Sequence, residues 1–139
     1  MTAKEWLNRG WKLNNEINQL LEAKRKAFEL ATKAATGTAE ERVQTTKTNT
    51  SENRMIRLAD YDIEIDRQID KLVAIKHEIL TAISAVEDPT CRALLVARYI
   101  NFKTWEDIAE DIDKSERWVR TNIHQRALKK MESVIHSPR

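Results

Sequence analysis

Basic side chains recur at close spacing between Lys114 and Met131, and this pattern suits contacts with a nucleic acid. The segment holds six bases against the single acid Glu116. The nine residues before it, 105–113, hold five acids and no base. A helix that enters a groove of DNA passes between phosphate groups and needs cations, whereas its neighbour does not. We therefore predict that residues 115–131, the basic helix, bind DNA; the structural alternative is a solvated basic helix.

Five side chains of the basic helix are predicted to point toward the groove or its walls. Arg117 and Arg120 are the strongest candidates for base or phosphate contacts, because arginine can donate two hydrogen bonds to guanine. Glu116 either accepts a hydrogen bond from cytosine or complements the positive end of the helix. Thr121 is placed to touch a thymine methyl group, and His124 either contacts a phosphate or is solvated.

Other side chains of this segment are expected to contact the DNA backbone. Ser115 caps the basic helix, and its backbone N–H is a candidate phosphate donor. Trp118 either packs against the preceding helix beside Trp105 or contacts the DNA backbone. The remaining phosphate-binding candidates are cations: Lys114, Arg126, Lys129 and Lys130.

Three short helices are predicted to position these residues, and the first runs from Asp88 to Ile100. Asp88 suits the N-cap, and Pro89 suits the first helical position because its φ angle is already helical. Asn101 and Phe102 are expected to end this helix.

The second and third helices are predicted from their caps and apolar spacing. Thr104 caps the second helix, with Asp107 three residues later in a capping-box pattern. A tight turn at residues 113–114 follows, and Ser115 caps the third helix. The predicted buried stripe of the second helix is Ile108, Ala109 and Ile112. That of the third is Val119, Ile123, Ala127 and Met131, each four residues from the last.

Two long helices are predicted before this region, over residues 2–35 and 54–86. Their apolar residues alternate in steps of three and four, which favours coiled-coil-like packing. The stretch between them, 36–53, is interpreted as a flexible linker because six of its 18 residues are threonine. We expect an antiparallel helical hairpin over residues 1–87. Two helices alone bury too little surface, so the hairpin should pack on the C-terminal helices, form a homodimer, or do both.

Composition limits the classes of protein that fit. The chain has 139 residues, 33% charged and with only two glycines and two prolines, which favours an all-α fold. The net charge is −1 over residues 1–88 and +3 over residues 89–139. One cysteine suits a reducing cytoplasm, and no apolar run approaches the roughly 20 residues of a membrane span. We expect a protein of the bacterial cytoplasm without membrane contact.

Catalytic and metal-binding patterns are not found in the sequence. The three histidines and one cysteine lack the spacing of zinc ligands, and no glycine-rich phosphate loop is present. Paired acids such as Glu106 and Asp107 fall on a helix predicted to be solvated. We therefore interpret the protein as a non-enzyme with no cofactor.

The C-terminal third resembles region 4 of bacterial sigma factors, which reads the −35 promoter element. The resemblance rests on Asp107-Ile108-Ala109-Glu110, on Ser115-Glu116 and on Val119-Arg120. It agrees with the helix-turn-helix that the caps, turn and apolar stripe predict in residues 88–135. Residues 136–139 are expected to form a disordered tail.

The whole chain resembles a narrower group, the phage and prophage transcriptional regulators of the autolysin-regulator (ArpU-like) type. The similar stretches are the opening TAKEWL, the Asp88-Pro89 junction, the run from Leu95 to Tyr99, and SERWV at 115–119 followed by His124 and ALKK at 127–130. This resemblance implies a regulator of late phage genes for packaging or lysis. Double-stranded DNA would be its partner, with RNA polymerase as a further candidate.

The sequence also departs from the sigma pattern. Asp113 stands at a turn position usually held by glycine, and Lys114 at a position that is usually apolar. The spacing from His124 to Ala127 is one residue longer than in ordinary sigma factors. No segment resembles the region that melts promoter DNA. Two alternative functions stay open: a small-terminase-like recognition protein for DNA packaging, and a helical protein-interaction adaptor.

Overall fold

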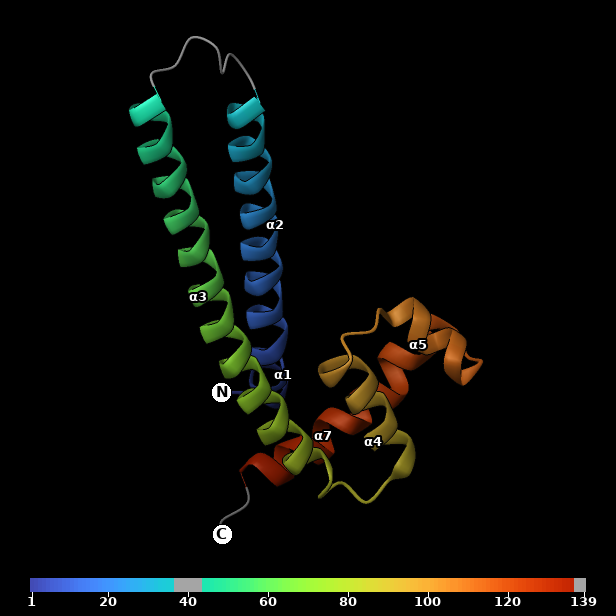
Figure 1. The fold of residues 1–139 in the computed structure, drawn as a ribbon. Helices are drawn as coiled ribbons and strands as arrows, with labels where there is room; N and C mark the ends of the chain where they lie inside the picture. Colours follow the sequence, from blue (N-terminus) through green and yellow to red (C-terminus); the bar gives the residue numbers. More distant parts are fainter. Residues whose placement is uncertain (37–43, 137–139) are drawn as a thin grey trace. The chain divides into compact units, whose positions relative to one another are not determined.

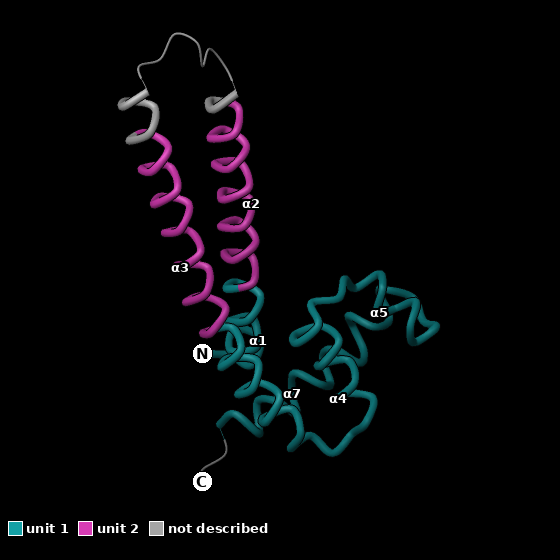
Figure 2. Tube along the Cα trace, in the orientation of Figure 1, with its two compact units in different colours: residues 1–13, 72–139 teal, residues 14–71 magenta. Residues whose placement is uncertain are grey.

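Every regular element that the structure describes is a helix. The computed structural model describes residues 1–36 and 44–136 (Figure 1), and no strand occurs in those ranges. The predicted all-α fold is therefore confirmed. The chain divides into two compact units: unit 1 comprises residues 1–13 and 72–139, and unit 2 comprises residues 14–71 (Figure 2).

The first long helix is interrupted near its start. Helix α1 covers Ala3–Leu7 and α2 covers Arg9–Thr36, with Asn8 between them as the C-cap of α1. Thr2 and Glu5 form the reciprocal capping box that the sequence predicts, so the entry of the chain into α1 is fixed by two hydrogen bonds.

The second long helix, α3, covers Gln44–Ile83 and begins ten residues earlier than predicted. The interpretation of residues 36–53 as a linker is wrong for residues 44–53, whereas residues 37–43 lie outside the described residues. The stretch 44–53 contains no glycine or proline to end a helix, but its polar composition offers no apolar periodicity from which a helix could be predicted.

Unit 2 consists of the parts of α2 and α3 that run side by side in Figure 2. An ion pair between Lys24 and Asp62 joins the two helices. Ile17, Ile65 and Gln68 are buried. Among the residues of this unit whose side chains the structure describes, large apolar side chains remain exposed at Leu21, Phe28, Leu30, Met55, Ile56, Ile63 and Ile69.

Unit 1 contains the remaining helices. After α1 and the end of α3, they are α4 (Pro89–Leu95), the π-helix η2 (Val96–Ile100), α5 (Trp105–Ile112), α6 (Glu116–Trp118), the π-helix η3 (Val119–Ile123) and α7 (His124–Ile135). The Asp88 carboxylate caps α4 by accepting from the backbone N–H groups of Thr90 and Cys91, at 2.9 and 3.3 Å. Phe102, with φ 56°, lies just after η2, where the sequence predicts the helix to end.

The π-helix η3 keeps the apolar stripe of the basic helix on one face. Residues four apart drift by about 40° around an α-helix, so a long stripe of four-residue steps leaves one face. A π turn, with its i→i+5 hydrogen bonds, holds more residues per turn and offsets this drift. Val119, Ile123, Ala127 and Met131 accordingly all stay buried, each at most 1% exposed. The predicted stripe is confirmed.

The core of unit 1 includes both ends of the chain. Leu94, Tyr99 and Ile108 are 1% exposed or less, and they share one cluster with Leu7 and Ile79. The separation expected between residues 1–87 and 88–135 therefore does not match the division into units. Apolar residues near the start of α1 and the end of α3 complete the core around the C-terminal helices.

Candidate nucleic-acid interface

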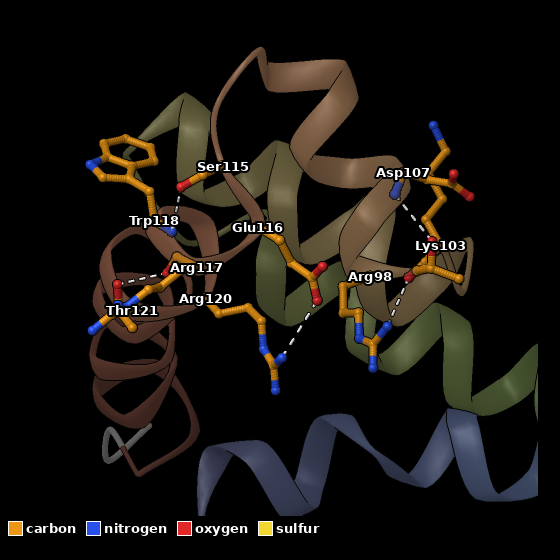
Figure 3. Close-up of polar contacts among 10 residues, drawn as sticks. Arg98, Lys103, Asp107, Ser115, Glu116, Arg117, Trp118, Arg120 and Thr121 are labelled. Atoms are coloured by element: carbon orange, nitrogen blue, oxygen red, sulfur yellow. Dashed lines mark hydrogen bonds and ion pairs between the residues drawn. The ribbon is translucent and has the colours of Figure 1, made fainter.

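The basic helix presents an exposed and well-anchored N-terminal turn. The Ser115 hydroxyl accepts a hydrogen bond from the Trp118 backbone N–H at 3.1 Å, which confirms the predicted cap. The Thr121 hydroxyl donates to the Arg117 carbonyl oxygen at 2.7 Å (Figure 3). Arg117 itself is exposed. These contacts hold the backbone while leaving the guanidinium group of Arg117 accessible.

Asp113 forms the turn that precedes this helix. It adopts a left-handed conformation, with φ 61° and ψ 46°, and its N–H and that of Lys114 bond back to carbonyl groups of α5. Aspartate tolerates this conformation better than most residues other than glycine. The Thr104 hydroxyl caps the start of α5 by accepting from the Asp107 N–H at 3.1 Å. The turn predicted between α5 and the basic helix is thus present.

Arg120 and Glu116 form an ion pair one turn apart on the basic helix. Their Nη1 and Oε1 atoms lie 3.5 Å apart, and both side chains are about half exposed. The Arg120 guanidinium also lies 5.9 Å from the Trp105 ring centroid. An exposed pair of this kind contributes only about 0.2–1 kcal/mol, so Arg120 can exchange Glu116 for another anion at small cost.

His124 lies in the core, and the prediction that it faces a groove or solvent is wrong. It is 4% exposed, its Nε2 lies 2.7 Å from the Tyr99 hydroxyl oxygen, and its ring packs on Trp105 at 4.4 Å. Burial, followed by the charges of Lys4, Arg98 and Arg120, lowers its pKa to about 4. His124 is therefore neutral near pH 7 and serves as a hydrogen-bonded core residue.

Trp118 is 37% exposed, and the Lys114 ammonium lies 5.3 Å from its ring centroid. Trp105 is the tryptophan that packs on His124. Trp118 lies in the first turn of the basic helix, about 100° around the helix from the buried Val119.

The other phosphate-binding candidates lie farther along the basic helix. Lys129 and Lys130 are exposed. The Nε atom of Arg126 lies 3.8 Å from the Oδ2 atom of Asp88. The pKa of Asp88 is lowered, chiefly by its hydrogen bond from the Cys91 backbone and least by Arg126. Arg126 thus has a carboxylate partner that the sequence did not reveal.

A cleft of about 790 Å³ adjoins the exposed turn, and we call it the cationic cleft. Of the predicted site residues, it is lined by Glu116, Arg117, Arg120, Thr121 and His124. Lys4, Asn8 and Arg98 also line it, and the sequence did not assign them to the site. Lys4 and Asn8 lie more than 100 residues from the basic helix, so only the tertiary fold brings them there.

Arg98 has three close partners at the edge of the cationic cleft. Its guanidinium lies 4.4 Å from the ring centroids of both Trp11 and Trp105. It also donates a hydrogen bond to the Lys103 carbonyl oxygen at 2.9 Å. Burial is the largest cause that lowers the pKa of Arg98, and Arg120 adds to it. The two stacked rings fix where this charge sits.

Comparison with known proteins found no matching family model, no similar curated protein and no similar solved structure. Within residues 1–36 and 44–136, no group of histidine, cysteine and acidic side chains is placed to hold a metal ion. In the same part of the chain, no helix has the length and apolar character needed to cross a membrane.

Proposed function

We propose that the protein is a sequence-specific binder of double-stranded DNA, with α5 and the basic helix acting as a helix-turn-helix. The observation that carries this proposal is the exposed, Ser115-capped turn that presents Arg117 and Arg120 beside a helix free of bases. The acidic α5 would stay away from the phosphates, and the basic helix would enter the major groove.

The contacts of this interface divide into two kinds. Arg117, Arg120 and Thr121 are the proposed base-reading residues, with Glu116 released from Arg120 on binding. Lys114, Lys129 and Lys130 are the proposed phosphate contacts, and they would set the register of the protein on DNA rather than its sequence preference.

The resemblance to phage regulators of the autolysin-regulator type extends this proposal to transcription. On that basis the protein would act in the bacterial cytoplasm and control late phage genes, with RNA polymerase as a candidate second partner. It would bind the promoter regions of these genes.

The exposed apolar residues of unit 2 support the proposal that the hairpin mediates self-association. Phe28 and Leu30 are 57% and 68% exposed, and Met55 and Ile63 exceed half exposure. A second copy packed on these helices would form a four-helix assembly, and a two-fold dimer suits a palindromic DNA site.

Binding measurements on single-arginine variants test the proposed interface. Arg117→Ala and Arg120→Ala should each weaken binding to a selected DNA site by about 1–3 kcal/mol, that is by roughly 5-fold to 150-fold, and relax its sequence preference. Arg57→Ala in unit 2 is the matched control, because Arg57 is also exposed. Unchanged DNA affinity in both basic-helix variants would remove this helix from the interface.

The exposed unit 2 surface also favours one alternative, a packaging protein that assembles as a ring on DNA. Light scattering or sedimentation of the full chain separates the two functions. A monomer or dimer agrees with the regulator, whereas a ring of many copies agrees with the packaging protein.

A further inference from the structure

The cationic cleft gathers more positive charge than its own acid can neutralise. Glu116 is the only carboxylate among the residues that line it. Four cations line it: Lys4, Arg98, Arg117 and Arg120. Glu116 pairs with Arg120 at 3.5 Å. Among the described residues no carboxylate lies within ion-pair distance of Lys4, Arg98 or Arg117. The cleft therefore carries a formal excess of three positive charges.

Three of these cations lie near one another at the cleft. The side chains of Arg98 and Arg120 extend in the same direction from η2 and η3 (Figure 3). Lys4 lines the cleft from α1. The charges of Lys4, Arg98 and Arg120 all act on His124, which lines the same cleft. Because His124 is neutral, it adds no repulsion and leaves these cations free to bind an anion.

Aromatic side chains line part of the cleft. Trp105 packs on His124, and His124 is hydrogen-bonded to Tyr99. The guanidinium of Arg98 is held between Trp11 and Trp105 before any ligand arrives. Preorganised cations lose little side-chain entropy on binding. The volume of about 790 Å³ falls within the range of about 300–1,000 Å³ of small-molecule sites.

We propose that the cationic cleft is a binding site for phosphate groups, held by Lys4 and Arg98 together with Arg117 and Arg120. The excess charge matches a ligand that carries two or more phosphate charges, and arginine forks suit phosphate oxygens. The phosphates come either from a free polyphosphorylated molecule or from a DNA backbone that enters the cleft. A free ligand would occupy Arg117 and Arg120 and so compete with DNA. The site does not depend on DNA binding, because a free anion needs only these four cations.

Titration calorimetry with inorganic tripolyphosphate at low ionic strength tests the site on the full chain. The wild type should bind, and Lys4→Glu should weaken binding by about tenfold or more, since it replaces an attractive charge with a repulsive one. Lys12→Glu is the control, because Lys12 is exposed, lies one turn beyond the cleft residue Asn8 and does not line the cleft. It should change the affinity less than twofold. Lys4→Ala provides a second variant, and thermal melting checks that each is folded.

The same variants assayed on DNA identify the source of the phosphates. Tripolyphosphate binding that Lys4→Glu weakens by about tenfold or more and Lys12→Glu leaves nearly unchanged supports a free ligand. Lys4-dependent DNA binding without tripolyphosphate binding supports the DNA backbone, with the salt slope reduced by about one in Lys4→Ala. If neither ligand distinguishes Lys4→Glu from Lys12→Glu, the site is overturned. Lys4-dependent tripolyphosphate binding by a protein that binds no DNA would leave this site standing and remove the proposed function.

Discussion

The two compact units of this protein bury their apolar residues to different extents. In unit 1, Leu94, Tyr99, Ile108 and Met131 are all at most 1% exposed, because several helices from both ends of the chain surround them. In unit 2, two long helices cover only one face of each other, and residues such as Leu30 remain 68% exposed. A helix pair has too few neighbours to bury a wide apolar stripe.

This difference separates two roles. The residues proposed to bind DNA and phosphate all lie in unit 1, where a closed core fixes their backbones. Unit 2 leaves apolar surface uncovered, as expected of a surface that binds another protein copy. Stability should therefore depend mainly on unit 1, and association mainly on unit 2.

The largest expected effect comes from matched leucine truncations in the two units. Leu94→Ala removes a fully buried side chain and should lower the free energy of unfolding by about 2–5 kcal/mol. Leu30→Ala removes an exposed side chain and should change it by less than about 0.5 kcal/mol at low protein concentration. Urea unfolding measures both. Similar losses from the two variants would contradict the contrast between the units.

Acid titration should reveal the buried His124. The pKa is about 4 in the folded protein, below the ordinary value of 6.5, so the unfolded chain binds the proton more readily between these values. The free energy of unfolding should fall as the pH drops from about 6.5 toward 4, and this contribution should level off below that.

His124→Gln is the variant that tests this pH dependence. A glutamine has no charge to gain and can still meet the Tyr99 hydroxyl, whose own pKa is raised by burial to about 12. Thermal melts at a series of pH values should show a shallower decline for the variant between pH 6.5 and 4. Parallel declines for both proteins would place the titrating group elsewhere.

A smaller effect is expected at the cap of the basic helix. Ser115→Ala removes the acceptor of the Trp118 N–H and should cost about 0.5–2 kcal/mol of stability. Ser133→Ala is the control, because Ser133 is exposed within α7. Chemical unfolding should show a larger loss of stability for Ser115→Ala than for Ser133→Ala. Equal stabilities would show that the cap contributes nothing.

Local signals in the sequence were sufficient to predict the caps, the turn and the buried stripe of unit 1. Thr104, Asp113 and Ser115 determine the turn and caps through contacts within three to five residues, which a sequence displays directly. The four-residue stripe also predicted the buried face from Val119 to Met131. The four-residue spacing of this stripe continues through the π-helix η3, which the sequence did not predict.

The failures involve contacts between distant parts of the chain or segments without a pattern. His124 was assigned to the surface because its burial depends on Tyr99, 25 residues away, and on Trp105. The sequence does not assign Lys4 and Arg98 to the candidate site, because the fold, rather than any motif, brings them to the basic helix. The start of α3 was missed because a polar helix without glycine or proline resembles a polar linker.

Selection of DNA fragments bound by the full chain from a bacterial genome with its prophages tests the central claim most directly. The wild type should enrich a defined site at a salt concentration near 0.15 M, and a protein carrying both Arg117→Ala and Arg120→Ala should lose that enrichment. A site upstream of late phage genes would support the proposed regulator. Uniform recovery of all fragments by the wild type, with binding that depends only on salt, would contradict sequence-specific DNA recognition.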